Sequence, residues 1–321
     1  MTLSGDGLWN GGVVQGRQSL GVNALTGFSQ TADGVLTSGG AVTVSTGTLE
    51  TAGALSAQGL QLRTGLWRNQ GAVSLTGDGQ LTVDELDNGG TLLSSGVWEI
   101  AGGAVTNRGT LQGERLTLQG GRLDNDGRLG GLTQLDLTLS GALANRGTVS
   151  GNRLAVTAGS LDNGGTLLGV EVLTLTADGA LTNTGRLLTP GAAVLTAASV
   201  VNAGEGQAGR LQLTSGALAN TGTLAVNGGA WLTLDGLDNR GTLSALGDLT
   251  VTGADLRNAG RLAARGALTL SGNYGGAGEL YSEGALGLSG AVLVNGGGRW
   301  QGETVAVRGG PARPTAARSR G

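Results

Sequence analysis

The stretch LDNGGTL, residues 86–92, decides the fold, because near copies of it recur along most of the chain. The repeat period is 18 to 20 residues, and the copies begin at Leu86, Val105, Leu123, Leu143, Leu161, Leu181, Leu218, Leu237 and Leu256. A unit this short cannot bury its apolar face alone, so each copy must stack on the next. The sequence therefore predicts a solenoid rather than a set of globular domains.

The Asn of this phrase, called the marker Asn below, gives the register of the repeat. It occurs at Asn69, Asn88, Asn107, Asn125, Asn145, Asn163, Asn183, Asn202, Asn220, Asn239 and Asn258. The same position is held toward the amino terminus by Thr51, Ala32 and Asn10, and toward the carboxyl terminus by Gly276 and Asn295. Together these positions predict about 16 turns, of which the first is irregular because Asn10 precedes Ala32 by 22 residues.

A second apolar pair follows 9 to 12 residues after the marker Asn, as in Leu116 and Leu118 or in Leu249 and Val251. Strict alternation points both side chains of a pair to one side of a strand. Runs of this length are too short for helices, and hairpins would reverse the phrase on alternate passes. We therefore predict an all-β fold, a parallel β-helix solenoid of about 16 coils over residues 1–308. Stacked at about 4.8 Å per coil, it would extend for roughly 70 Å.

The composition limits which functions this chain can have. Cysteine and histidine are absent, which excludes disulfides, thiolate metal sites and any catalytic triad that contains histidine. The net charge of −3 is too balanced for an ordinary nucleic-acid binder. No apolar run approaches the roughly 20 residues that cross a bilayer, and the first residues lack the pattern of a secretory signal. Residues 309–321 contain prolines and arginines without acidic residues, and we predict a disordered Arg-rich tail there.

The marker Asn and the glycine that follows it have structural roles in this prediction. In a parallel coil each Asn would stack on the Asn of the adjacent turns and form a hydrogen-bonded amide ladder. The glycine two residues later is expected to adopt a positive φ at a corner. Glycosylation is not expected, because none of these Asn residues is followed two places later by Ser or Thr.

Charged residues next to the marker Asn alternate in sign between turns. Arg108, Asp126 and Arg146 follow the marker Asn on three successive turns. Asp238 precedes it on one turn and Arg257 precedes it on the next. We expect opposite-charge ladders at these positions, each pair worth about 0.2 to 1 kcal/mol if exposed.

The paired L-x-N-x-G-T-L and L-x-L-T elements, the period and the absence of cysteine resemble the haemagglutinin repeats of filamentous haemagglutinin and related exoproteins of two-partner secretion. The resemblance covers residues 8–308 and implies a right-handed β-helical shaft. It implies secretion through a dedicated outer-membrane transporter and display on, or release from, a Gram-negative cell. Members of this family are adhesins, or shafts that carry a toxin in contact-dependent growth inhibition. The partner would then be a receptor or glycan on a host or neighbouring cell.

No Asn-Pro dipeptide occurs in the chain, so it lacks the Asn-Pro-Asn element of the family's secretion domain. No globular toxin domain is visible at the carboxyl end either. We therefore expect an internal fragment of a larger secreted protein, with no nucleic-acid partner and no membrane span.

Two other functions compete with the shaft. A β-helical carbohydrate-active enzyme would need clustered carboxylates, and Glu99 and Asp136 are the best candidates, with Thr117 on the turn between them. Two coils separate them by about 10 Å, at or beyond the limit for an inverting pair. A lattice binder, for example of ice, would need an unbroken threonine array, but Glu99 and Asp136 interrupt it. We expect no enzyme activity, no cofactor and no metal.

The five tryptophans could suggest sugar stacking, but they are scattered among the turns: Trp9, Trp67, Trp98, Trp231 and Trp300. Core filling, packing at corners or isolated exposure is the interpretation favoured here.

Overall fold

The computed structural model describes residues 1–309 and divides into two compact units, Met1–Ala198 and Ser199–Gly321. The described residues contain strands and turns but no helix, and strands on adjacent turns pair in parallel, as β11 does with β9 and β21 with β23. The prediction of an all-β parallel solenoid of about 16 turns is confirmed for these residues. Gly309 ends the last strand, and the remainder of the predicted tail lies outside the described residues.

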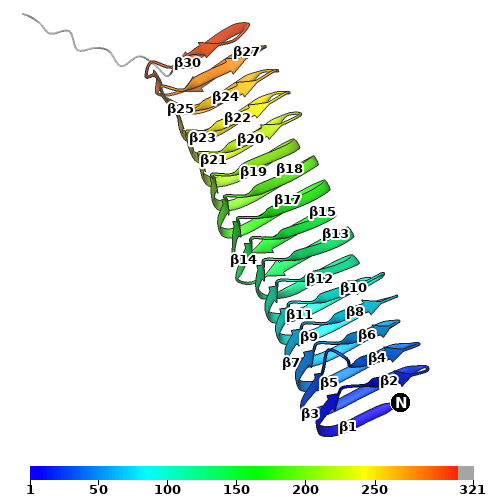
Figure 1. Ribbon diagram of the computed structural model, residues 1–321. Coiled ribbons are helices and arrows are strands. Elements are labelled where there is room, and N and C mark those ends of the chain that lie inside the picture. Colours follow the sequence, from blue (N-terminus) through cyan, green and yellow to red (C-terminus); the bar gives the residue numbers. More distant parts are fainter. Residues whose placement is uncertain (310–321) are drawn as a thin grey trace, which may run out of the picture. The chain divides into compact units, whose positions relative to one another are not determined.

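Long and short strands alternate through most of the first unit (Figure 1). Its longer strands are β1 (Thr2–Asn10), β3 (Ser19–Gln30), β5 (Ala41–Thr51), β7 (Gly59–Asn69), β9 (Gly79–Asn88), β11 (Val97–Asn107), β12 (Thr110–Asn125), β13 (Arg128–Leu139), β15 (Thr148–Ala158) and β17 (Thr166–Asn183). Its four-residue strands are β2 (Val13–Gly16), β4 (Val35–Ser38), β6 (Ala54–Ala57), β8 (Ala72–Leu75), β10 (Thr91–Ser94), β14 (Ala142–Asn145) and β16 (Ser160–Asn163). The division between the units falls within β18 (Arg186–Asn202).

The second unit has the same alternation. Its longer strands are β19 (Glu205–Asn220), β21 (Ala230–Asn239), β23 (Leu249–Asn258), β25 (Leu268–Gly276), β27 (Ala285–Gly290) and β30 (Thr304–Gly309). Its shorter strands are β20 (Thr223–Val226), β22 (Thr242–Ala245), β24 (Arg261–Ala264), β26 (Glu279–Ser282), β28 (Leu293–Asn295) and β29 (Trp300–Gln301).

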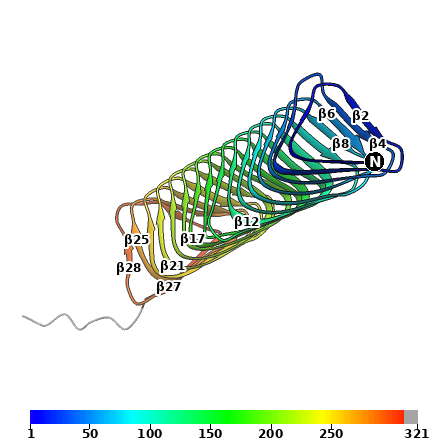
Figure 2. The same cartoon turned by 90° about the horizontal axis from the view of Figure 1, so that it is seen from below.

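Strands pair with their counterparts one turn away, in the register that the marker Asn predicts from Thr51 onward. Toward the amino terminus the prediction of Ala32 is wrong, because Gln30 pairs with both Asn10 and Thr51. In the first unit Asn107 pairs with Asn88 on one side and with Asn125 on the other. In the second unit Asn239 pairs with Asn220 and with Asn258. Figure 2 shows the result for the first turns, where β2, β4, β6 and β8 follow one another along the same path.

One turn contains three inward-facing pairs of side chains, one more than the sequence indicated. In β10 the pair is Leu92 and Ser94, and in β11 the pairs are Trp98 with Ile100 and Val105 with Asn107; all six side chains are buried. The extra pair begins at the last Leu of the repeated phrase, because alternation restarts after the corner. Each fully buried Leu in these columns contributes about 1.5 to 3 kcal/mol.

The prediction that the glycine of the phrase adopts a positive φ is wrong for the copies that begin at Leu86 to Leu256. Within residues 1–309 only Gly272, Gly276 and Gly297 have a positive φ, and of these only Gly297, two residues after Asn295, is at the predicted position. The glycine is needed because the backbones approach closely. A Cβ on Gly109 would lie 1.9 Å from the carbonyl oxygen of Gly90, and that same oxygen accepts a hydrogen bond from the amide of Thr110 at 2.9 Å.

None of the described residues forms a helix long and apolar enough to cross a membrane.

Candidate functional site

The marker Asn residues form buried chains of side-chain hydrogen bonds within each unit. In the first unit Nδ2 of each Asn from Asn69 to Asn163 donates to Oδ1 of the Asn on the next turn, at 2.7 to 2.8 Å. In the second unit Asn202, Asn220 and Asn239 donate in the same way, at 2.7 to 2.8 Å. We call these chains the Asn ladders.

Each Asn in a ladder uses its hydrogen-bonding groups within the solenoid. Nδ2 of Asn88 also donates to the carbonyl oxygen of Thr110 at 3.2 Å. The backbone oxygen of Asn88 accepts from the amides of Arg108 and Gly109 at 2.8 and 3.0 Å. Such an Asn is buried and offers no free donor to a ligand.

The ladders end on other side chains. In the first unit Thr51 Oγ1 donates to Asn69 Oδ1 at 2.8 Å, and Trp67 Nε1 donates to Thr51 Oγ1 at 2.9 Å. In the second unit Asn258 Nδ2 donates to the carbonyl oxygen of Glu279 at 3.1 Å. On the next turn, Tyr274 lies where other turns have a Leu of the phrase.

The charged residues near the marker Asn form exposed ion pairs. Arg146 binds Asp126 at 2.8 Å, and this hydrogen bond raises the pKa of Arg146 above its ordinary value. Arg108 pairs with Asp87 on the preceding turn rather than with Asp126. Thus the structure brings Asp126 and Arg146 together but joins Arg108 to a carboxylate outside the predicted set.

The pair predicted in the second unit has a different arrangement. Asp238 and Arg257 are register neighbours on β21 and β23. Their side chains bind within their own turns, Asp238 to Arg240 at 3.0 Å and Arg257 to Asp255 at 3.1 Å. All these groups are largely exposed, so each pair contributes at most about 1 kcal/mol.

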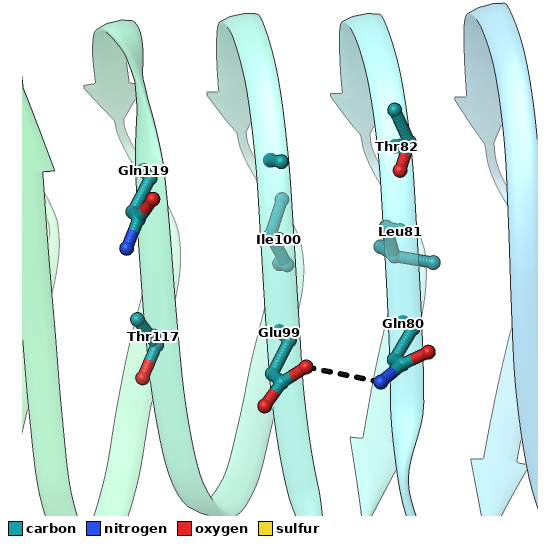
Figure 3. Close-up of a pocket in the computed structure, with 8 residues that line it drawn as sticks. Gln80, Leu81, Thr82, Glu99, Ile100, Thr117 and Gln119 are labelled. Atoms are coloured by element: carbon teal, nitrogen blue, oxygen red, sulfur yellow. Dashed lines mark hydrogen bonds between the residues drawn. The ribbon is translucent and has the colours of Figure 1, made fainter.

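A shallow hollow of about 500 Å³ lies on the outer face of β9, β11 and β12 (Figure 3). Gln80 Nε2 donates to Glu99 Oε2 at 3.1 Å in this hollow. The polar residues that line it are Gln80, Thr82, Glu99, Thr117 and Gln119. Asp136 follows Thr117 in the same column and accepts from Gln134 Nε2 at 2.7 Å. Thr117 therefore lies between the two candidate carboxylates, Glu99 and Asp136. Within residues 1–309 no three Asp or Glu side chains are grouped so that they could hold a metal ion.

A second hollow, of about 630 Å³, lies over Gly275 in the second unit. Arg257 and Asp255 form part of its wall, and Val292 and Val294 form an exposed apolar part. Gly275 has nothing within 4 Å of where a Cβ would be, which explains the depression.

Tyr274 lies buried beside this hollow and meets Trp300 edge to face, with 5.5 Å between the ring centroids. Burial raises the pKa of Tyr274. The nearby polar groups of Asn258 and Trp300 act in the opposite direction and lower the pKa of Tyr274. Neither group has hydrogen-bond geometry to the Tyr274 hydroxyl, which has no hydrogen-bond partner within residues 1–309.

The tryptophans separate into buried and exposed residues. Trp67 and Trp98 are fully buried, whereas Trp9 is 71% and Trp231 is 49% exposed. Sequence reasoning missed this distinction, although a signal was present. Trp98 aligns with the inward-facing Leu116, whereas Trp231 aligns with the outward-facing Gln212 and Thr250.

Comparison with known proteins identifies relatives that share this repeat. The family model of the haemagglutinin repeat matches residues 115–188, 149–217 and 206–308, which together cover more than half of the chain. No solved structure matches the chain.

The curated relatives are much longer proteins. Deoxyribonuclease CdiA of Dickeya dadantii (strain 3937) is 52% identical over 97% of this chain, which spans 11% of that relative. tRNA nuclease CdiA of Escherichia coli (strain NC101) is 31% identical over 70% of this chain, which spans 6% of it. 16S rRNA endonuclease CdiA of Enterobacter cloacae subsp. cloacae is 32% identical over 43% of this chain, which spans 5% of it.

Proposed function

We propose, on the premise that this chain belongs to the haemagglutinin repeat family, that it is a structural and adhesive shaft segment of a large secreted surface exoprotein. That exoprotein would be a filamentous-haemagglutinin-like adhesin or the stalk of a contact-dependent inhibition protein. It would leave a Gram-negative cell through an outer-membrane two-partner transporter. Its surface would then meet a receptor or glycan on a host or neighbouring cell.

The observation that carries this proposal is the way each turn uses its polar groups. The buried marker Asn residues bind one another and the backbone, so the interior is committed to stacking turns. The two hollows described on the outer face, over Glu99 and over Gly275, are shallow and open to solvent. A surface of this kind supports many weak contacts rather than one reaction centre.

The names of the relatives also support a role apart from catalysis. These names describe a deoxyribonuclease, a tRNA nuclease and a 16S rRNA endonuclease. The three differ in substrate although all of them share repeat sequence with this chain. We infer that substrate choice in those proteins is determined outside the shared repeats.

The alternative, a β-helical carbohydrate-active enzyme, is not favoured. Glu99 is bound by Gln80, Asp136 is bound by Gln134, and Thr117 lies on the turn between them. Hydrolysis of a glycosidic bond needs an acid and a base that flank the bond at a closer spacing.

The test is made in the parent exoprotein with two variants. The first lacks this segment, and the second carries an equal number of turns from another haemagglutinin repeat protein in its place. We expect the deletion to reduce binding of the exoprotein to target cells, measured by flow cytometry. The cell binding that the replacement variant recovers measures the shaft role, and the binding that it does not recover measures specific adhesion by this segment. Undiminished binding in the deletion variant would contradict the proposal.

A further inference from the structure

Trp231 is a large aromatic side chain of the second unit that faces outward from a strand. It lies in β21 between the buried residues Ala230 and Leu232, and it is 49% exposed. Its register neighbours are Gln212 on β19 and Thr250 on β23. An exposed indole leaves apolar surface in water, and a ligand that covers this surface gains free energy.

The indole ring of Trp231 lies against the backbone of Gly229. A Cβ at Gly229 would be 2.6 Å from Cη2 of Trp231 and 3.1 Å from Cζ2. Because Gly229 has no side chain, the ring can occupy the space where a Cβ would otherwise be. The far end of the ring thus lies next to the protein backbone, while about half of the residue remains exposed.

Two charged side chains flank this position on the adjacent turns. Because Leu211 pairs with Ala230 and Ala230 pairs with Leu249, Arg210 and Asp248 are the register neighbours of Gly229. Arg210 makes no ion pair with any residue in 1–309, and its Cγ would be 3.4 Å from a Cβ at the adjacent Gly228. Asp248 accepts a hydrogen bond from the amide of Ala267 at 2.8 Å through Oδ1, which leaves Oδ2 available.

The outward side chains that follow Trp231 on its strand are polar, first Thr233 and then the exposed Asp235. Thr233 follows Trp231 at the next outward position, and its register neighbours are Thr214 and Thr252. These three hydroxyls are spaced by one turn, about 4.8 Å. The position thus combines an aromatic face with a cation, a carboxylate and a row of hydroxyls, and these groups together have a formal charge of zero.

We propose that Trp231, with Arg210, Asp248 and Thr233, forms a binding subsite for a neutral pyranose ring of an oligosaccharide. A β-linked hexose presents a face of axial C–H bonds that packs on an indole, while its equatorial hydroxyls point sideways. Those hydroxyls can accept from the Arg210 guanidinium and donate to the Asp248 carboxylate. This inference rests on the adhesive part of the proposed function, because it names the class of ligand that the shaft would contact.

The test is native affinity electrophoresis of the full chain in gels that contain a neutral β-glucan, hydroxyethyl cellulose, or a neutral galactomannan. We expect at least one of them to retard the protein. Trp231→Ala should bind about tenfold more weakly, because an aromatic contact and its buried area are lost. Trp231→Phe should retain most of the binding, and Arg210→Gln should weaken it.

Trp9→Ala provides a matched control. It removes another exposed indole that lies over a glycine, Gly11, in the first unit. It should leave the retardation unchanged, and circular dichroism should show that both alanine variants melt like the parent chain.

Three results would overturn the subsite: no retardation by either neutral polysaccharide, equal retardation of the Trp231→Ala variant, or tighter Trp231-dependent binding to heparin, which is anionic. If the gels fail while deletion of the segment still reduces cell binding, the subsite is wrong and the shaft proposal stands. If the gels succeed while cell binding survives the deletion, the shaft proposal is wrong and the subsite stands.

Discussion

At the scale of single residues, Asn107 shows why the repeat keeps an amide at the marker position. Its Oδ1 accepts from Asn88 and its Nδ2 donates to Asn125, both at 2.7 Å, and it is fully buried. A buried amide is costly unless its donors and acceptor are used. Here the amides of Asn88 and Asn125 bind the amide of Asn107. The hydrogen bonds to the adjacent turns therefore offset the free-energy cost of burying the Asn107 amide.

Asn107→Ala should therefore destabilise the first unit more than an ordinary truncation. It leaves Asn88 Nδ2 and Asn125 Oδ1 without their ladder partner, and we expect a loss of about 2 to 5 kcal/mol. The free energy of unfolding from urea denaturation measures it. Asn23→Ala, at an exposed Asn of β3, should change stability by less than about 0.5 kcal/mol. Equal effects of the two substitutions would contradict the proposed role of the ladder.

Tyr274 is a second residue whose environment has a measurable consequence. Its hydroxyl is buried without a partner, and burial raises its pKa above the ordinary value of 10.0. The folded state therefore holds this proton more tightly than the unfolded state. Retention of this proton contributes stability that is fully present below pH 10. That stability is lost as the pH rises through the raised pKa of Tyr274.

Tyr274→Phe should remove this part of the alkaline destabilisation. The variant should also be at least as stable as the parent at pH 7, because a buried unpaired hydroxyl costs about 1 to 3 kcal/mol. Thermal melting between about pH 8 and 11 measures both effects, and the reference pKa of tyrosine defines that window. Tyr281→Phe, at the only other tyrosine, is the control. An unchanged pH profile in the Tyr274 variant would argue against titration at this site.

At the scale of elements, the corner after each marker Asn determines how closely two turns can approach. In the second unit a Cβ on Gly241 would lie 2.1 Å from the carbonyl oxygen of Gly222, which accepts from the amide of Thr242 at 2.9 Å. The corner therefore requires a glycine for lack of space, since its φ is not positive.

Gly241→Ala should force adjacent turns apart and cost about 1 to 3 kcal/mol, as overpacking does elsewhere. Gly287→Ala is the matched control in the same unit, because nothing lies within 4 Å of its Cβ position. The midpoint of chemical denaturation distinguishes the two. If Gly241→Ala were as mild as Gly287→Ala, the corner would have room that the structure does not show.

The elements also show how far sequence reasoning reached. The register was predictable because three residue types recur together in each copy of the phrase. They are the marker Asn, such as Asn107, an apolar residue two positions before it and a glycine two positions after it. The third inward pair, such as Leu92 with Ser94, was less visible because its second member varies and the alternation restarts at a corner. Partners of exposed arginines such as Arg257 were not predictable, since a flexible side chain can reach several carboxylates of similar energy.

At the scale of the whole molecule, stability in each unit is a sum over turns and the interfaces between them. Strand pairs join each turn to its immediate neighbours, as β11 joins β9 and β12. The sequence predicted this architecture but not the exposure of Trp231, because that exposure depends on which side of a strand the residue occupies. That side can be read only after the register is known.

Removal of one whole turn, residues 89–107, should leave a folded solenoid, because it joins Asn88 to the corner that begins at Arg108. The ladder would then run from Asn88 to Asn125. Removal of about half a turn, residues 89–97, should disrupt the strands, because it breaks the register of inward side chains. Circular dichroism and the sharpness of thermal unfolding measure the difference. Similar spectra for both deletions would show that register matters little.

The Asn ladders have a direction. The amides from Asn69 to Asn163 in the first unit, and from Asn202 to Asn239 in the second, all donate toward the turn that follows in sequence. A growing stack that folds from its amino-terminal end thus always presents an unsatisfied N–H to the incoming segment, and an orphaned buried N–H is tolerated less well than an orphaned carbonyl. Docking of each new turn relieves that cost and creates it again one step further on. The two ends of a ladder are therefore chemically different: a turn added at the carboxyl-terminal end must bring an acceptor, and a turn added at the amino-terminal end must bring a donor.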